Sequence, residues 1–254
     1  MYRGGTSLSL TLLPFQFPGI PGVGCAFSMR GFGSVSLSGD EKAASAERRS
    51  SLPSLLGVQA FAEVHQVHGV RTVFEPEAQD PASTPSEQAD GMATSRPGLA
   101  LMIKTADCQP ILVAHESGRF VMAVHSGWRG NRQDYPRIAV EQFCEHYHLE
   151  PRELWAVRGP SLGPAASEFV NFDSEWGPDF LPWYDGARRT MDLWMLARHQ
   201  LESAGIMPGR LLSVDLCTFD NADLFFSYRH FRQRGSRDGR QGSFIWIRSG
   251  EKAS

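Results

Sequence analysis

The sequence has no long apolar segment and no marked excess of charge of one sign. Its longest uninterrupted apolar runs have five residues, as at positions 99–103 and 120–124, whereas a membrane-spanning helix needs about 20. The 254 residues carry 25 basic and 28 acidic side chains, for a formal net charge of −3. We therefore expect no membrane partner, and no basic field that would favour nucleic acid.

Cysteines are few and scattered. There are four, with no C-x-x-C pair among them: Cys25, Cys108, Cys144 and Cys217. A chain of this length can bury a sizeable core without disulfides, so the cysteines favour a reducing, cytoplasmic compartment. Prolines interrupt the apolar stretch 8–15 and follow it closely, and no small-residue cleavage site comes after it. We expect an edge strand there and not a secretory signal.

The pattern of apolar residues predicts strands and helices in an irregular order. Hydrophobic residues make up 41% and charged residues 21% of the chain, which excludes bulk disorder. Helical spacing marks 136–148, and Asp192 can cap a helix over 193–204 that Gly205 ends. Strand-like segments lie at 64–73, 99–103, 111–115, 119–124, 154–157, 211–216 and 244–247. Without a regular βαβ alternation, this predicts a single α+β domain over 1–254, a mixed sheet and helix sandwich.

A β-hairpin is the sharpest local prediction. Residues 111–115 and 119–124 are strand-like, and the three-residue loop between them ends in glycine. In that register His115 pairs with Arg119, which sets every later pair along the two strands.

The hairpin register brings two reactive side chains to its open end. Cys108 falls opposite Ser126, so Cys108 and His125 approach each other where facing residues lie about 5 Å apart. Strict alternation would nevertheless point these two side chains to opposite faces. Because Pro110 weakens regular pairing, a shared site requires the chain to leave the ladder nearby.

Three polar clusters near predicted strand ends offer chemistry. They are His65-Gln66-Val67-His68-Gly69, Thr105-Ala106-Asp107-Cys108 and His125-Ser126-Gly127-Trp128-Arg129-Gly130. Imidazole and thiolate are good zinc ligands, and catalytic zinc sites use three protein ligands with a fourth position open. A purely structural interpretation stays open as well, in which Cys108 packs as a small hydrophobic residue and His125 is a hydrogen-bonded strand residue.

The same clusters resemble the laccase-like polyphenol oxidase domain family, which includes the peptidoglycan editing factor and bacterial purine nucleoside phosphorylases. The matching segments occur in family order over about residues 17–248. They are Gln66-Val67-His68-Gly69, Ala89-Asp90-Gly91, Thr105-Ala106-Asp107-Cys108, His125-Ser126-Gly127-Trp128-Arg129-Gly130, Gly159-Pro160-Ser161-Leu162-Gly163-Pro164, Cys217-Thr218, Phe225-Phe226-Ser227-Tyr228-Arg229 and Gly239-Arg240-Gln241.

The resemblance implies one α+β domain with a metal site at strand ends, where His68, Cys108 and His125 bind one zinc, with copper as the other candidate. It also implies purine nucleoside phosphorolysis, with adenosine deamination and methylthioadenosine phosphorolysis as family activities. The expected partners are a small-molecule nucleoside and phosphate. The chain departs from the family pattern at Ala165-Ala166-Ser167 and at His230, which bears on substrate preference more than on the metal.

Several further residues are candidates for roles around Cys108 and His125. Arg129 has the fork geometry that suits phosphate, or else forms a structural ion pair, and Arg229 and Arg240 are second choices. Asp107 adjoins a ligand and could orient it. Gln66 could bind a base edge or only the backbone, and Asp90 could equally be a turn residue.

The residues bear on three alternative functions. A true multicopper oxidase needs many paired histidines, whereas this chain has one H-x-H and no histidine beside a cysteine, so we reject it. A cysteine amidohydrolase with Cys108 as nucleophile and His125 as base remains open, and fits the peptidoglycan-editing role within the family. A non-enzymatic zinc module is disfavoured, because structural zinc usually has four protein ligands. The sequence leaves the oligomeric state undetermined.

Overall fold

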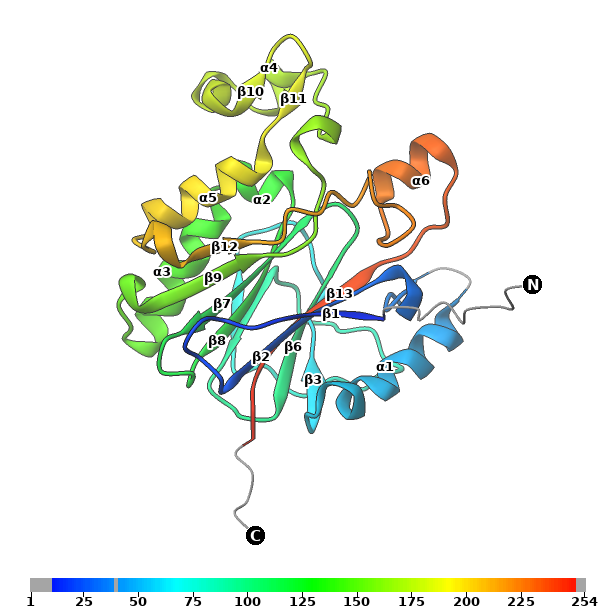
Figure 1. Ribbon diagram of the computed structural model, residues 1–254, viewed down its shortest axis with the longest axis vertical. Helices are drawn as coiled ribbons and strands as arrows, with labels where there is room; N and C mark the ends of the chain where they lie inside the picture. Colours follow the sequence, from blue (N-terminus) through cyan, green and yellow to red (C-terminus); the bar gives the residue numbers. More distant parts are fainter. Residues whose placement is uncertain (1–10, 39–40, 250–254) are drawn as a thin grey trace, which may run out of the picture.

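Two mixed β-sheets lie face to face at the centre of the structure, a computed structural model that describes residues 11–38 and 41–249 (Figure 1). The five-stranded sheet has the order β1 (Leu12–Phe15), β2 (Val23–Ser28), β13 (Gln241–Ile247), β6 (Leu99–Thr105) and β3 (Ala60–Ala62). The six-stranded sheet has the order β12 (Leu211–Ser213), β9 (Leu154–Arg158), β7 (Gln109–His115), β8 (Val121–Ser126), β5 (Gly91–Thr94) and β4 (Thr72–Phe74). The α+β prediction is confirmed.

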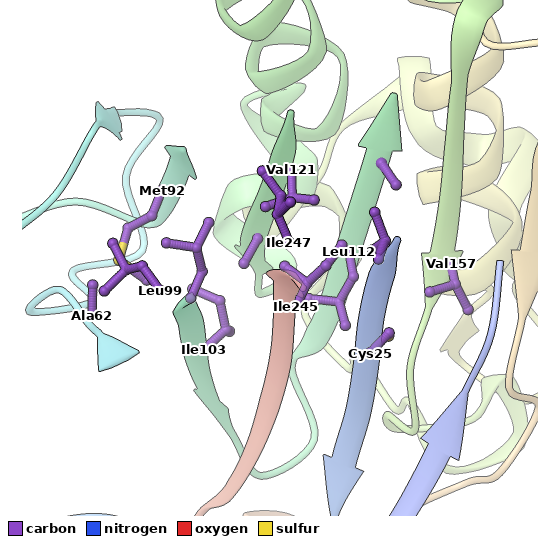
Figure 2. Close-up of a cluster of buried hydrophobic side chains, with 14 of the residues drawn as sticks. Cys25, Ala62, Met92, Leu99, Ile103, Leu112, Val121, Val157, Ile245 and Ile247 are labelled. Atoms are coloured by element: carbon purple, nitrogen blue, oxygen red, sulfur yellow. The ribbon is translucent and has the colours of Figure 1, made fainter. Parts of the chain in front are cut away.

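The main core fills the space between the sheets (Figure 2). Cys25, Ile103 and Ile245 come from the five-stranded sheet, and Leu112 and Val121 face them from the six-stranded sheet. All are buried. Their burial on facing sheets is the main apolar contribution to stability.

Helices cover both outer faces of the sheets. The helices α3 (Tyr135–Tyr147) and α5 (Leu193–Ser203) pack on the six-stranded sheet, and α1 (Lys42–Leu56) packs on the five-stranded sheet. Because β6 is buried on both faces, its residues form the uninterrupted apolar run 99–103 and not an alternating pattern.

The remaining elements are short, and several surround the functional site. They are η1 (Arg30–Phe32), α2 (Trp128–Arg132), η2 (Pro151–Glu153), η3 (Pro164–Ala166), α4 (Phe172–Glu175), η4 (Pro178–Trp183), β10 (Tyr184–Asp185), β11 (Thr190–Met191), η5 (Pro208–Arg210) and α6 (Tyr228–Arg234). The segment with α4, β10 and β11 projects from the sandwich (Figure 1) and has an apolar cluster of its own around Phe169 and Trp176. None of the helices in the described part of the chain has the length and apolar character to cross a bilayer.

Most predicted elements are confirmed, with corrections to two strands and to the hairpin. Asp192 caps α5 by accepting the Met195 N–H at 2.9 Å, and an edge strand covers 12–15, while residues 8–10 lie outside the described part. The strand predicted over 64–73 is wrong, because most of that segment is a loop whose N–H groups bond to a carboxylate instead of a neighbouring strand. The strand predicted over 211–216 ends at residue 213.

The predicted hairpin exists, but its register is shifted by one residue. His115 pairs with Phe120, not Arg119: its N–H donates to the Phe120 carbonyl at 3.0 Å. Gly118 adopts a left-handed φ of 68°, and Arg119 is an additional loop residue, so the loop has four residues and not three.

The corrected register removes the conflict over which face the site occupies. Ser126 lies opposite Gln109, and His125 lies opposite Pro110. Directly opposed residues share a face, and Cys108, two residues before Pro110, has the same parity. Cys108 and His125 therefore reach one site without a break in the ladder, which Pro110 itself joins.

Candidate metal centre

Three potential metal ligands meet at one end of the sheet sandwich. One nitrogen of His68, the Sγ of Cys108 and one nitrogen of His125 all lie within 4.8 Å of one another. The Cys108 Sγ is 4.0 Å from His68 Nε2, and the two imidazole rings are nearly perpendicular with centroids 4.8 Å apart. This brings together the three residues that the resemblance implied.

Each ligand comes from a different part of the chain. Cys108 directly precedes β7, and His125 is the penultimate residue of β8. His68 lies in the loop between β3 and β4 with a left-handed φ of 62°. Such a backbone conformation is uncommon for a residue other than glycine, so it needs support from its surroundings.

The buried carboxylate of Asp90 provides that support. One oxygen accepts the His68 N–H at 2.9 Å and lies 2.8 Å from His125 Nδ1, and the other accepts the N–H groups of Val67 and Gly69. With Nδ1 bonded to Asp90, His125 presents Nε2 to the other two ligands. One carboxylate thus orients two of the three potential ligands.

Gly127 leaves room beside the cluster. A Cβ atom at this position would lie 2.9 Å from His68 Cδ2 and 3.0 Å from Cys108 Sγ. Any larger residue would displace the ligands, so glycine is required here by close approach rather than by a left-handed φ.

The electrostatics favour a thiolate–imidazolium pair in the metal-free protein. Burial raises the pKa of Cys108, but the charge and hydrogen bonds of the two histidines outweigh burial and lower this pKa to about 6. Burial lowers the pKa of His125, but the Cys108 charge and the Asp90 carboxylate raise it overall to about 9. Hydrogen bonds from His125 and backbone N–H groups also hold the pKa of Asp90 below its ordinary value, against the effect of burial.

The donor set fits a single divalent metal. Two imidazole nitrogens and a thiolate suit zinc or copper, and three protein ligands leave a position for another group. The buried Asp90 carboxylate behind His125 is the outer partner that metal-bound histidines usually have.

Two cavities flank the cluster and share His68, Ala106, Cys108 and Tyr228 in their walls. The first, of about 570 Å³, is bordered by Gln66 and Arg240. The second, of about 450 Å³, is bordered by Arg129 and Arg229. Every arginine predicted from the sequence to bind phosphate therefore lines one cavity or the other.

The candidate arginines differ in how much their side chains are already engaged. Arg129 is exposed, stacks on Trp128 with its guanidinium carbon 4.3 Å from the ring centroid, and forms no ion pair within residues 11–38 and 41–249. Arg229 donates to the Glu168 carbonyl at 3.1 Å. Arg240 is paired with Asp238 at 2.6 Å. Arg129 is thus the most available of the three for an anion.

Asp107 does not contact either histidine through its carboxylate. The carboxylate accepts the Thr218 hydroxyl at 2.8 Å and the Arg229 N–H at 2.6 Å. Asp107 has a φ of 90°, so these bonds hold the unusual backbone directly before Cys108.

The side-chain amide of Gln66 is bonded to backbone. Its oxygen accepts the Lys104 N–H at 2.9 Å, and its nitrogen donates to the Lys104 carbonyl at 2.8 Å. Of the two roles predicted for Gln66, binding a base edge or binding only the backbone, the structure shows the backbone contact.

Some site residues had no clear signal in the sequence. Asp90 looked as much like a turn residue as a functional one, because its partners are 21 to 35 positions away. Tyr228 borders both cavities, but only the family motif around it drew attention to that segment.

The sandwich and the His–Cys–His cluster define a class of α+β protein with a potential mononuclear metal centre at its strand ends. Comparison with known families is specific. The chain belongs to the multi-copper polyphenol oxidoreductase laccase family, whose family model matches residues 26–248. The family that its motifs resemble is confirmed.

Named relatives and solved structures agree with this assignment. The chain is 33% identical over 244 residues to a purine nucleoside phosphorylase of Xylella fastidiosa, covering 89% of this chain and 88% of the relative. It is 32% identical over 195 residues to the purine nucleoside phosphorylase YfiH of Shigella flexneri, covering 72% of each chain. The fold matches the crystal structure of YlmD from Geobacillus stearothermophilus with a TM-score of 0.81 at 24% identity, covering 91% of this chain and 94% of the other.

We expect the metal-free protein to bind about one divalent ion per chain, with an affinity that rises with pH. At pH 7 the Cys108 thiol is already ionised and His125 is protonated, so binding releases the His125 proton. The apparent affinity should rise about tenfold per pH unit between about pH 6 and 9 and more steeply below pH 6, where Cys108 is also protonated. Calorimetric titration in buffers of different ionisation enthalpy measures both the metal affinity and the number of protons released.

His125→Ala should abolish this binding. His199→Ala, outside the cluster on α5, should bind as the wild type does. Full metal occupancy in the His125 variant, or an affinity that does not change from pH 6 to 9, would show that the cluster is not the metal centre.

Asp90→Asn should lower metal affinity about 10- to 100-fold, the usual effect of losing an outer partner of a ligand. The amide group replaces one acceptor oxygen with a donor that faces N–H groups. Competition with a chromogenic chelator measures the change. Asp80→Asn is the control, because this exposed carboxylate also accepts a backbone N–H but lies in a distant loop. Equal affinities in the two variants would contradict the role of Asp90.

Proposed function

We propose that the protein is a zinc-dependent purine nucleoside phosphorylase that acts on adenosine, inosine or methylthioadenosine and also deaminates adenosine. The observation that carries the proposal is the three-ligand cluster between two cavities with arginines in their walls. The names of the relatives support the reaction class. The partners we propose are a nucleoside and phosphate.

In phosphorolysis, a phosphate oxygen forms a bond to the sugar C1′ as the bond from C1′ to the base nitrogen breaks. The leaving base carries the electron pair of that bond and takes up a proton. Zinc, or copper in its place, would supply Lewis acidity at the fourth position when bound. Through His68, Cys108 and His125 the chain would hold that ion at the junction of the two cavities.

Arg129 is the residue we propose for holding phosphate. Its guanidinium is exposed, is stacked on Trp128, and borders the second cavity. Stacking fixes the plane of the fork, so two parallel hydrogen bonds to phosphate require little further ordering. Arg229 and Arg240 are proposed as additional contacts to substrate. Gln66, which lines the first cavity, is proposed as a further contact, for which its amide must release the Lys104 backbone.

Asp107 has a positioning role in the proposed reaction. Its bonds to the Thr218 hydroxyl and to the backbone N–H of Arg229 tie the residue before Cys108 to the start of α6, which carries Tyr228.

A second candidate function is a Cys–His amidohydrolase that edits peptidoglycan precursors. The specific observation in its favour is the thiolate–imidazolium pair backed by the Asp90 carboxylate, which is the arrangement of an activated cysteine nucleophile. A non-enzymatic metal module is the third and weakest, because only three ligands converge among the described residues.

We also propose that one domain spans 1–254 and that the protein works in the cytoplasm. The family match over 26–248 supports the first proposal. The four free cysteines, Cys25, Cys108, Cys144 and Cys217, support a reducing compartment.

Purified protein incubated with inosine, adenosine and methylthioadenosine should release the free base only when phosphate is present. Adenosine should also yield inosine without phosphate, because water then replaces the amino group. Cys108→Ala removes a ligand and should abolish both reactions, as measured by chromatography of the products. Three results together would contradict the phosphorylase and support the amidohydrolase: amide cleavage without phosphate, a trappable thioester, and activity that survives chelation.

Arg129→Lys should raise the apparent KM for phosphate at least about tenfold, because a hydrogen bond to a charged group contributes about 1.5–3 kcal/mol. The lysine keeps the charge and loses the fork. Steady-state rates at varied phosphate and saturating nucleoside measure it. Arg132→Lys on the same helix, which borders neither cavity, is the matched control. An unchanged KM for phosphate would assign Arg129 to structure alone.

A further inference from the structure

A buried ion network lies beside the first cavity, away from the metal ligands. The carboxylate of Glu63 has no exposed surface; it contacts Arg49 through one oxygen and Lys104 Nζ, at 2.7 Å, through the other. Arg49 is also fully buried, and Lys104 retains 18% of its side-chain surface. The network therefore holds two cations and one carboxylate.

The excess positive charge of this network lies in the wall of the first cavity. Arg49, Lys104 and Arg240 all border this cavity, and none of the acidic side chains of residues 11–38 and 41–249 does. Arg240 is balanced by Asp238, so the excess belongs to the Arg49–Glu63–Lys104 network. Burying unbalanced charge is costly unless a counter-charge is supplied.

One residue in the wall of the same cavity also has an unused hydrogen-bond donor. The Nε of Arg49 is buried and finds no acceptor within the described residues. The cavity is also lined by the hydroxyl-bearing residues Ser36, Ser38 and Thr84, and the Ser36 and Ser38 side-chain oxygens are 2.7 Å apart. Cationic donors together with hydroxyl groups match an acceptor that has several oxygens and a negative charge.

We propose that the Lys104 end of the first cavity is a phosphate-binding subsite, distinct from Arg129 on the other side of the metal cluster. Its ligand is a phosphate group, either orthophosphate or the 5′-phosphate of a nucleotide. This inference rests on the proposed function only in assigning the subsite a part in a nucleoside reaction. The charge argument for an anion site does not depend on that function.

The test measures binding of orthophosphate, adenosine and adenosine 5′-monophosphate to the metal-loaded protein by calorimetry, without turnover. Lys104→Met should weaken binding of one phosphate-bearing probe at least about tenfold, the effect of losing one charge-assisted hydrogen bond, and leave adenosine unchanged. Lys104→Arg should retain binding. Lys42→Met removes an exposed lysine of α1 that lies outside the cavity and serves as the matched control.

Lys104→Met should fold, because it leaves Arg49 and Glu63 as a balanced one-to-one pair; an unchanged urea unfolding midpoint checks this. Weaker orthophosphate binding assigns the subsite to free phosphate, and weaker nucleotide binding alone assigns it to a phosphate ester. Wild-type affinity for both probes overturns the subsite, even if phosphorolysis is observed. Conversely, loss of phosphate binding in Lys104→Met supports the subsite even if no phosphorolysis occurs.

Discussion

The hydrogen bonds of the Asp90 carboxylate are the constraint on which the candidate metal centre depends. One buried side chain accepts three consecutive N–H groups at 67–69 and also bonds to His125 Nδ1. A loop and the end of strand β8 are thus joined through one acceptor group. Because a buried carboxylate without such donors is strongly disfavoured, the loop conformation and the ionised state of Asp90 stabilise each other.

The charges in the cluster are arranged to receive a divalent cation. Without metal, the Cys108 thiolate and the Asp90 carboxylate share one protonated His125, so the two anions are only partly neutralised by it. A metal would replace the imidazolium proton and leave the same two anions close to it. A divalent cation bound here would therefore meet anionic groups that Cys108 and Asp90 already provide.

The sequence was most informative where structure is local. The apolar runs at β6 and β8, the Asp192 cap and the amphipathic spacing of α3 each depend on neighbours within a few residues, and each was predicted correctly. The hairpin was predicted with the wrong register, because counting residues cannot show that Arg119 joins the loop after the left-handed Gly118. One residue of slip reverses the facing of every side chain in a strand.

The tertiary contacts of the site could not be predicted from local sequence patterns. His68 was implied by family resemblance alone, since nothing near it in the chain says that its loop folds over Cys108. The sequence does not predict a role for Glu63 or Lys104, because a single acidic residue and a single lysine near strands are common. Their importance arises only when β3 and β6 pair in parallel and bring the two segments together.

Backbone conformation at two positions shows that the cluster is shaped in advance. His68 has a φ of 62° and Asp107, next to Cys108, has a φ of 90°; each such conformation costs about 1–3 kcal/mol unless the surroundings impose it. At His68 the cost is offset by Asp90, and at Asp107 by Thr218 and Arg229. The backbone at two of the three potential ligands is thus held by carboxylate hydrogen bonds that require no metal.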